Sequence, residues 1–194
     1  MLIASCKAGT SLITLDEMAD QLIKKLGGTC SFYQHHGFPG HICISVNQQL
    51  IHGIPDDYII QPNDLVTFDV GVTYNNHLCD AAYTVLVAPG DNADARRISE
   101  VTHECLMESI KEIKPGNYTG DISHKIYQIA KINGYEVIKD FGGHGCGNQV
   151  HEDPMILNYG EPGSGVRLVK GMVLCIEPML MTKSDKYFID SQNQ

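Results

Sequence analysis

The chain has 194 residues, of which 43% are hydrophobic and 19% are charged, and its formal net charge is −9. This length and composition predict a single globular domain, and the negative charge argues against direct binding of nucleic acid. The apolar runs are too short to span a membrane, and the N-terminus lacks the charged start and apolar core of a signal peptide. Seven scattered cysteines predict free thiols in a cytoplasmic protein.

An internal repeat predicts two related amphipathic helices. Lys7-Ala8-Gly9 and the residues after it match Lys114-Pro115-Gly116 and its successors at a constant offset of 107. In both copies, apolar residues recur at helical spacing and stop at a glycine. We expect Thr14 to cap the first helix and Glu17 to close a capping box. A further helix is expected over residues 98–113. Duplicated segments of this length predict pseudo-symmetric parts of one domain.

A histidine follows the strand that is predicted over residues 43–47. His52 lies just before Gly53 and Pro55, two residues that favour a turn. Taken alone, a histidine at this position also has an ordinary structural explanation.

Residues 66–85 predict a β-hairpin that carries two carboxylates. β-Branched and aromatic residues alternate on both sides of Asn75-Asn76, and asparagine tolerates the positive φ of a two-residue turn. The resulting register places Asp69 opposite Ala82 and makes Asp80 its diagonal neighbour on the same face, about 7–8 Å away. Two carboxylates this close on a half-buried face require a cation or a shared proton. The alternative is a pair of solvated aspartates on an exposed face.

Two later segments contain further candidate ligands. Glycines surround His144 and allow backbone to approach a ligand closely, and His151 follows with Glu152-Asp153-Pro154 behind it. The apolar run from Val173 predicts a strand that ends at Glu177. The alternatives are a glycine-rich loop with a surface histidine and a strand-end carboxylate that reaches water.

Taken together, these residues resemble the methionine aminopeptidases. The motifs that carry the resemblance are Ser45-Val46-Asn47 through His52-Gly53-Ile54-Pro55, the Asp69/Asp80 pair, Gly143-His144-Gly145 with His151-Glu152-Asp153-Pro154, and Ile176-Glu177-Pro178. The resemblance extends from about Lys7 to the C-terminus. It implies a pita-bread fold of the α/β (α+β) class, in which helices back a curved antiparallel sheet with an internal pseudo-twofold repeat.

The same resemblance implies two divalent metal ions bound by Asp69, Asp80, His144 and Glu177, with Asp80 bridging both. Carboxylate oxygens with one imidazole favour manganese, iron or cobalt, and zinc is a further candidate. The family uses a last bridging glutamate that has no counterpart before Gln194. The sequence is therefore expected to be one catalytic domain, residues 1–194, that is truncated at the N-terminal helix and the C-terminal strands, with a weakened second metal site.

The resemblance also assigns roles around the metals. His151 is expected to steady the carbonyl oxygen as it becomes an oxyanion, and His52 to contact the scissile amide. Glu177 doubles as the carboxylate that accepts a proton from water. The catalytic set is thus His52, His151 and Glu177. Substrate-binding residues are His52, His151, Phe38 and Cys43, and the last two suit a methionine thioether.

The function implied is removal of the initiator methionine from nascent proteins with a small second residue, at the ribosome and through a metal-activated hydroxide. Nascent polypeptide N-termini are the expected partners, without membrane or nucleic-acid contacts. One alternative is a catalytically incomplete relative that acts as a peptide- or protein-binding module. Another is dipeptidase or X-Pro peptidase activity on the same fold.

Overall fold

The computed structural model describes residues 1–189. They divide into two compact units, residues 1–96 with Ile189 and residues 97–188. The strands form a four-stranded, a two-stranded and a three-stranded sheet. Within each sheet, neighbouring strands pair antiparallel. Helices and antiparallel sheets together confirm the mixed α/β class. Across these described residues, no helix combines the length and the apolar character that a membrane span requires.

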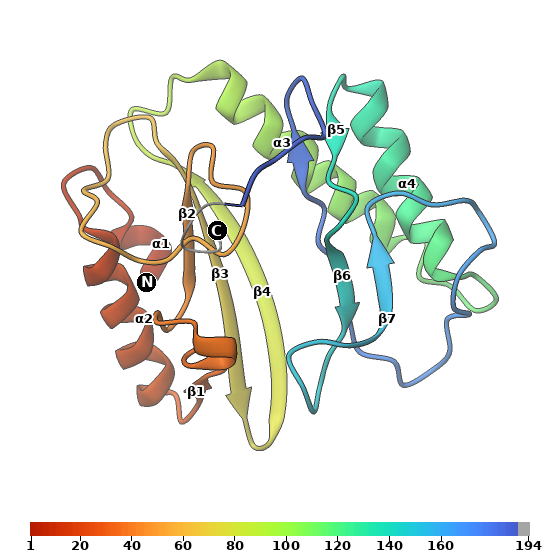
Figure 1. The fold of residues 1–194 in the computed structure, drawn as a ribbon, viewed down its shortest axis with the longest axis horizontal. Coiled ribbons are helices and arrows are strands. Elements are labelled where there is room, and N and C mark those ends of the chain that lie inside the picture. Colours follow the sequence, from red (N-terminus) through yellow and green to blue (C-terminus); the bar gives the residue numbers. More distant parts are fainter. Residues whose placement is uncertain (190–194) are drawn as a thin grey trace. The chain divides into compact units, whose positions relative to one another are not determined.

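The first unit is organised around one long central strand. Its elements are α1 (Leu2–Ser5), α2 (Leu12–Lys25), β1 (Thr29–Cys30), the 3-10 helix η1 (His35–Gly37), β2 (Cys43–Val46), β3 (Leu65–Tyr74) and β4 (His77–Leu86). β4 pairs along one edge of β3, whereas β2 and β1 pair with successive parts of the other edge (Figure 1). Helix α2 contributes Leu15 to a core that contains Ile44 of β2 and Phe68 of β3. Burial of this apolar stripe holds the helix to the sheet.

The β3–β4 hairpin has the register that the sequence predicts. Asn75 and Asn76 both have positive φ, 50° and 62°, as a two-residue turn between right-twisted strands requires. Asp69 lies opposite Ala82 and Asp80 opposite Gly71. The two carboxylates therefore project from the same face of the hairpin.

The second unit packs two helices with short strands. Its elements are α3 (Ala93–Ile110), which begins in the first unit, then α4 (Thr119–Ile132), β5 (Glu136–Val137), β6 (Gly142–Gly145), β7 (Glu152–Leu157), β8 (Leu174–Cys175) and β9 (Leu180–Met181). α4 packs beside β7 (Figure 1). Val101 of α3, Ile122 and Ile126 of α4 and Ile156 of β7 are almost fully buried in one core. The helix expected over residues 98–113 is confirmed, although it begins earlier and ends sooner.

The predicted repeat appears in the bounds of the elements. Helices α2 and α4 start and end 107 residues apart, and the short strands β1 and β5 that follow them have the same offset. The glycine after each helix, Gly27 or Gly134, has a positive φ, 85° or 79°. This conformation is the usual way to end a helix, because glycine adopts it without steric cost.

The predicted start of the first helix was wrong. Ser11 caps α2, and its hydroxyl accepts a hydrogen bond from the backbone N–H of Thr14 at 3.2 Å. Thr14 is thus inside the helix, and its own hydroxyl lies 2.8 Å from that of Ser11. Both residues are good caps, and only the earlier one has extended backbone at this point.

The strand expected from Val173 to Glu177 is shorter than predicted. β8 contains only Leu174 and Cys175, and Glu177 follows it. The β6–β8 ladder ends at Cys175, before Glu177, and Pro178, which has no N–H to donate, cannot resume it. The expected truncation of the C-terminal strands concerns the end of the sequence, where residues 190–194 lie outside the described residues.

Asp16 of α2 fixes the segment that leads into β2. Its Oδ1 accepts the backbone N–H groups of His41 and Ile42 at 2.7 and 3.0 Å, and its Oδ2 lies 2.6 Å from Nδ1 of His41. The ring of Tyr33 stacks on that imidazole, with centroids 4.7 Å apart. Because Asp16 is only 7% exposed, it replaces the water that these N–H groups would otherwise bind.

Replacing Asp16 with alanine is expected to lower the free energy of unfolding by about 2–3 kcal/mol, because buried N–H groups lose their acceptor. Urea unfolding followed by circular dichroism measures this change. Asp57→Ala, at an exposed position of the same unit, is the matched control and is expected to change stability by less than about 0.5 kcal/mol. Similar losses in both variants would contradict the structural role of Asp16.

Candidate metal centre

The first group of candidate ligands lies on the β3–β4 hairpin. Asp69 and Asp80 are half-buried on one face, and Cys43 of β2 lies directly opposite Asp69 on the other neighbouring strand. Burial raises the pKa of the Cys43 thiol, and the negative charges of Asp69 and Asp80 raise it further. The negative charges of Asp69 and Asp80 thus act on a nearby thiol that stays protonated. A cation relieves this concentration of negative charge.

An aromatic side chain covers the same face beside the carboxylates. The Phe32 ring lies so close to Gly71 that a Cβ there would be 2.5 Å from Phe32 Cε1. Gly71 shares its face with Asp69, because residues two positions apart on a strand point to the same side of the sheet. Phe38, which we predicted to bind substrate, is half-buried just after η1. Burial lowers the pKa of His35 in that helix, and the charge of His36 lowers it further.

The second group of candidate ligands forms around β6. A Cβ on Gly143 would lie 2.0 Å from the carbonyl oxygen of Cys175, and one on Gly145 would lie 2.4 Å from that of Asp153. Glycines on both sides of His144 therefore allow β8 and β7 to approach the strand from its two edges. The β6–β7 register shifts between Gly143 and Gly145, so His144 has no partner in that ladder and pairs only with Cys175 of β8.

His144 is oriented as a metal ligand. Its Nδ1 lies 2.9 Å from the carbonyl oxygen of Gly145, so Nδ1 carries the proton in the neutral ring and Nε2 presents a lone pair. Nε2 is 3.0 Å from Oε1 of Glu177. Two electron-pair donors at this distance repel each other unless a cation or a proton lies with them.

The carboxylate of Glu177 fits the same interpretation. Its Oε1 is buried and accepts no aligned hydrogen bond from the described residues, although Nε2 of His144 is close. A short contact without hydrogen-bond alignment is what two ligands of one ion show. The Sγ atom of Cys175 belongs to this cluster too, and the ligand atoms of the three residues lie within 4.8 Å of one another. An imidazole nitrogen and a carboxylate oxygen this close together suit a divalent transition metal.

His151 stands beside this second group. Its ring and that of His144 have centroids 4.5 Å apart at an angle of 74°. The preceding turn is fixed by Glu152, whose Oε1 accepts the backbone N–H groups of Asn148 and Gln149 at 2.7 and 2.8 Å. His151 itself is exposed, as a residue that contacts a substrate requires.

His52 lies in the first unit, in a loop held against β2. It is exposed and has a φ of 57°. The next residue, Gly53, donates its N–H to Ser45 Oγ at 3.1 Å, and its carbonyl accepts the N–H of Ile44 at 2.8 Å. A Cβ on Gly53 would lie only 2.2 Å from the Ile44 carbonyl oxygen. The glycine thus allows the loop that carries His52 to lie directly on the strand.

The structure brings the predicted site residues together as two groups, one in each unit. Asp69 and Asp80 lie with Cys43, whereas Glu177 and His151 lie with His144. Sequence reasoning missed two members, namely Cys175 and the wall residue Phe32. Alternation along β8 was the available signal for Cys175, since it precedes Glu177 by two positions on the same face. No local pattern indicates Phe32, because its place depends on a contact with a distant strand.

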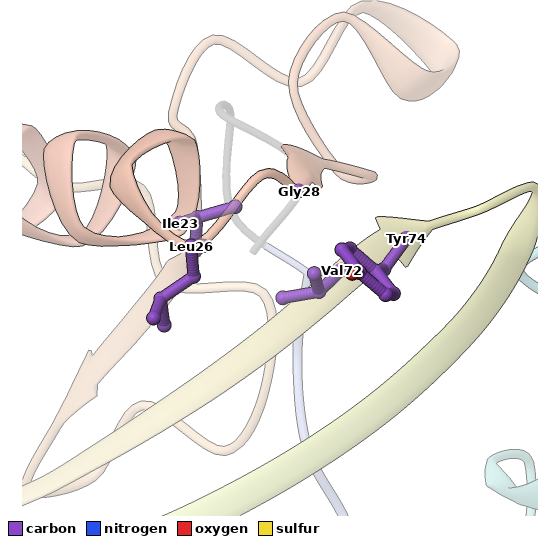
Figure 2. A pocket seen from close by; sticks show the side chains of 5 residues that line it. All are labelled: Ile23, Leu26, Gly28, Val72 and Tyr74. Carbon is purple, nitrogen blue, oxygen red and sulfur yellow. The ribbon is translucent and has the colours of Figure 1, made fainter.

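A shallow pocket of about 260 Å³ lies elsewhere in the first unit. It is lined by Ile23, Leu26, Gly28, Val72 and Tyr74, from the end of α2 and the end of β3 (Figure 2). These side chains offer neither a metal ligand nor a proton-transfer group except the Tyr74 hydroxyl. The pocket is therefore not part of the candidate metal centre.

Comparisons with known proteins agree with this chemistry. The profile of metallopeptidase family M24 matches residues 1–192. A methionine aminopeptidase of Mycoplasma genitalium is 40% identical over 95% of this chain and 75% of that protein. The crystal structure of methionine aminopeptidase from Thermotoga maritima has a TM-score of 0.95 and 36% identity, covering 99% of this chain and 77% of that one.

A prolidase from Pyrococcus horikoshii is more distant, with a TM-score of 0.74 and 25% identity over 91% of this chain and 48% of that one. Both kinds of neighbour confirm the pita-bread fold. The relatives at about 40% identity are methionine aminopeptidases, which supports an enzyme over the non-catalytic binding module. The chain belongs to metallopeptidase family M24, and within that family it belongs with the methionine aminopeptidases.

Proposed function

We propose that this chain hydrolyses the peptide bond after an N-terminal methionine when the second residue is small. The observation that carries the proposal is the pair His144 and Glu177, whose Nε2 and Oε1 atoms face each other at 3.0 Å without a hydrogen bond aligned between them. Membership of the M24 metallopeptidases supports the use of divalent metal by this pair.

The proposed metal ligands are Asp69, Asp80, His144 and Glu177. Two divalent ions of cobalt, manganese, iron or zinc fit a set dominated by carboxylate oxygen. When bound, such ions lower the pKa of water and polarise the scissile carbonyl. The protein contributes by fixing the ligands, as the Gly145 carbonyl does when it accepts a hydrogen bond from Nδ1–H of His144. We further propose that residues 1–194 act as one catalytic domain.

Three side chains are proposed to act on the substrate. One carboxylate oxygen of Glu177 accepts the proton that the attacking water loses, and returns it to the leaving amine. His151 donates a hydrogen bond from its ring to the carbonyl oxygen as that atom becomes negative. His52 holds the scissile amide. The exposed positions of both histidines support these roles.

The methionine side chain is proposed to lie against Phe38 and Cys43. Burial is the largest cause of the raised pKa of the Cys43 thiol, which therefore presents a soft, uncharged surface. Phe32 extends the same wall over Gly71. A wall of aromatic and sulfur groups favours a thioether over a charged side chain.

The proposed partners are the N-termini of nascent polypeptides at the ribosome, and the proposed location is the cytoplasm. The names of the relatives support the substrate, since these proteins are methionine aminopeptidases. The net charge of −9 supports contact with the emerging peptide rather than with nucleic acid.

Mass spectrometry of peptide products tests the proposal. The purified chain is incubated anaerobically with Met-Ala-Ser, Met-Lys-Ser and Ala-Pro-Ser peptides, with manganese, iron or cobalt supplied in turn. We expect methionine to be released from Met-Ala-Ser at least about tenfold faster than from Met-Lys-Ser, because one poorly fitting side chain costs about 1–3 kcal/mol. Faster cleavage before proline, or no methionine released by folded and metal-loaded protein, contradicts the proposed activity.

A further inference from the structure

Two thiols of the second unit face each other on one sheet. The Sγ atoms of Cys146 and Cys175 are 3.3 Å apart. His144 lies opposite Cys175 in the β6–β8 ladder, and the backbone N–H of Cys146 extends that ladder by donating to the Val173 carbonyl at 3.2 Å. Side chains two residues apart on a strand share a face, so the thiols belong to the same face as His144.

The backbone holds the two thiols in place. Gly143 brings β8 so close to β6 that a Cβ would be 2.0 Å from the Cys175 carbonyl oxygen. The thiols are diagonal neighbours across this tightly packed pair of strands, a relation in which side chains still touch. Diagonal neighbours lie about 7–8 Å apart, whereas the Cα atoms of a disulfide usually lie about 4.4–6.8 Å apart. Closing the Sγ–Sγ gap of 3.3 Å to the length of a disulfide, about 2.05 Å, therefore draws β6 and β8 together at this point.

Neither thiol has another cysteine as a closer alternative within the described second unit. The third cysteine there, Cys105, is fully buried in the α3–α4 core and donates its S–H to the Ile126 carbonyl. Cys146 and Cys175 are buried, with 6% and 8% of their surfaces exposed to solvent. The pair is therefore suited to react internally rather than with a second protein molecule.

We propose that Cys146 and Cys175 are a modification site at which hydrogen peroxide forms an intramolecular disulfide. One sulfur attacks a peroxide oxygen, the O–O bond breaks, and water leaves behind a sulfenic acid. The second sulfur then displaces the hydroxyl group as another water molecule. Two thiols and one peroxide give one disulfide and two water molecules, and the thiols lose the two electrons that the peroxide gains.

The disulfide links the chain directly after His144 with the strand directly before Glu177. Drawing the two sulfurs together moves both ends of the contact between Nε2 and Oε1, which is 3.0 Å in the reduced protein. Thioredoxin-type dithiols reverse such a bond by exchange. Peroxide thus reversibly inhibits the peptidase activity proposed above, and this regulation rests on that proposed function.

Peptide mapping tests the inference without any measurement of activity. The folded chain is treated with hydrogen peroxide, its remaining thiols are blocked with N-ethylmaleimide, and tryptic peptides are analysed by mass spectrometry without reduction. We expect a peptide that links Cys146 to Cys175 and lacks two hydrogens, and we expect it to disappear after treatment with dithiothreitol. Cys79→Ala, at an exposed cysteine of the first unit, is the control that still forms the link.

Other outcomes overturn the inference. These are sulfinic acid on Cys146 or Cys175 without a link, links that run only through Cys79, and a link that forms only after unfolding in urea. Cys146→Ala tests the partner relation in a protein whose fold is checked by circular dichroism. In this variant Cys175 is expected to stop at sulfenic acid, which a dimedone adduct reports, whereas an unchanged pattern of links contradicts the pairing.

Discussion

Asp80→Asn is expected to lower methionine release by more than about a hundredfold, because even residues that only support a ligand contribute about 10- to 100-fold. The amide cannot supply the negative charge that the carboxylate gives to a divalent ion. Affinity for Mn²⁺ is expected to fall with activity, and isothermal titration calorimetry measures this fall. The hairpin register is expected to persist, since Asn75 and Asn76 set it.

His151→Ala is the matched control for this prediction. His151 is exposed and its ring lies 4.5 Å from that of His144, so its removal is expected to leave affinity for Mn²⁺ within about twofold. The rate of methionine release is expected to fall about a hundredfold in His151→Ala, because the hydrogen-bond donor to the oxyanion is lost. Equal losses of Mn²⁺ affinity from Asp80→Asn and His151→Ala would overturn the assignment of these roles.

Gly143→Ala is expected to destabilise the protein by about 3 kcal/mol or more, because the added methyl group meets backbone rather than a flexible side chain. Its Cβ would lie 2.0 Å from the Cys175 carbonyl oxygen and 2.9 Å from the carbonyl carbon. The β6–β8 pairing has to separate, which moves Glu177 away from His144. Urea unfolding and Mn²⁺ titration report the two consequences.

Gly134→Ala provides the comparison for Gly143→Ala. Gly134 has a φ of 79° and nothing within 4 Å of a Cβ, so its substitution costs only the backbone strain of about 1–2 kcal/mol. The binding of Mn²⁺ is expected to stay unchanged in this variant. A stable Gly143→Ala protein with normal Mn²⁺ affinity would show that close approach of β8 is not required.

The sequence predicted the features that depend on local patterns. Alternation around Asn75-Asn76 determined the hairpin and its register, and thereby the shared face of Asp69 and Asp80. Glycines around His144 predicted close approach of backbone to a ligand; in the structure they allow the neighbouring strands to approach β6, and the approach to a ligand stays a prediction. The repeat predicted equivalent helices because a glycine stop and an apolar stripe recur at one spacing.

The features that sequence reasoning missed depend on contacts between distant segments. Asp16 resembles any acidic residue of a helix, and its role appears only when the N–H groups of His41 and Ile42 point at it. The choice between Ser11 and Thr14 as cap depends on which residue has extended backbone. The proximity of Cys146 and Cys175 follows from the pairing of β6 with β8, which no short motif encodes.

The matching offsets of α2 with α4 and of β1 with β5 mean that one local arrangement occurs twice in the chain. β1 pairs with the strand that carries Asp69, and β5 pairs with β9, which follows Glu177 along the chain. The same helix-and-strand arrangement thus stands next to two different ligand-bearing segments, one with paired aspartates and the other with a glutamate.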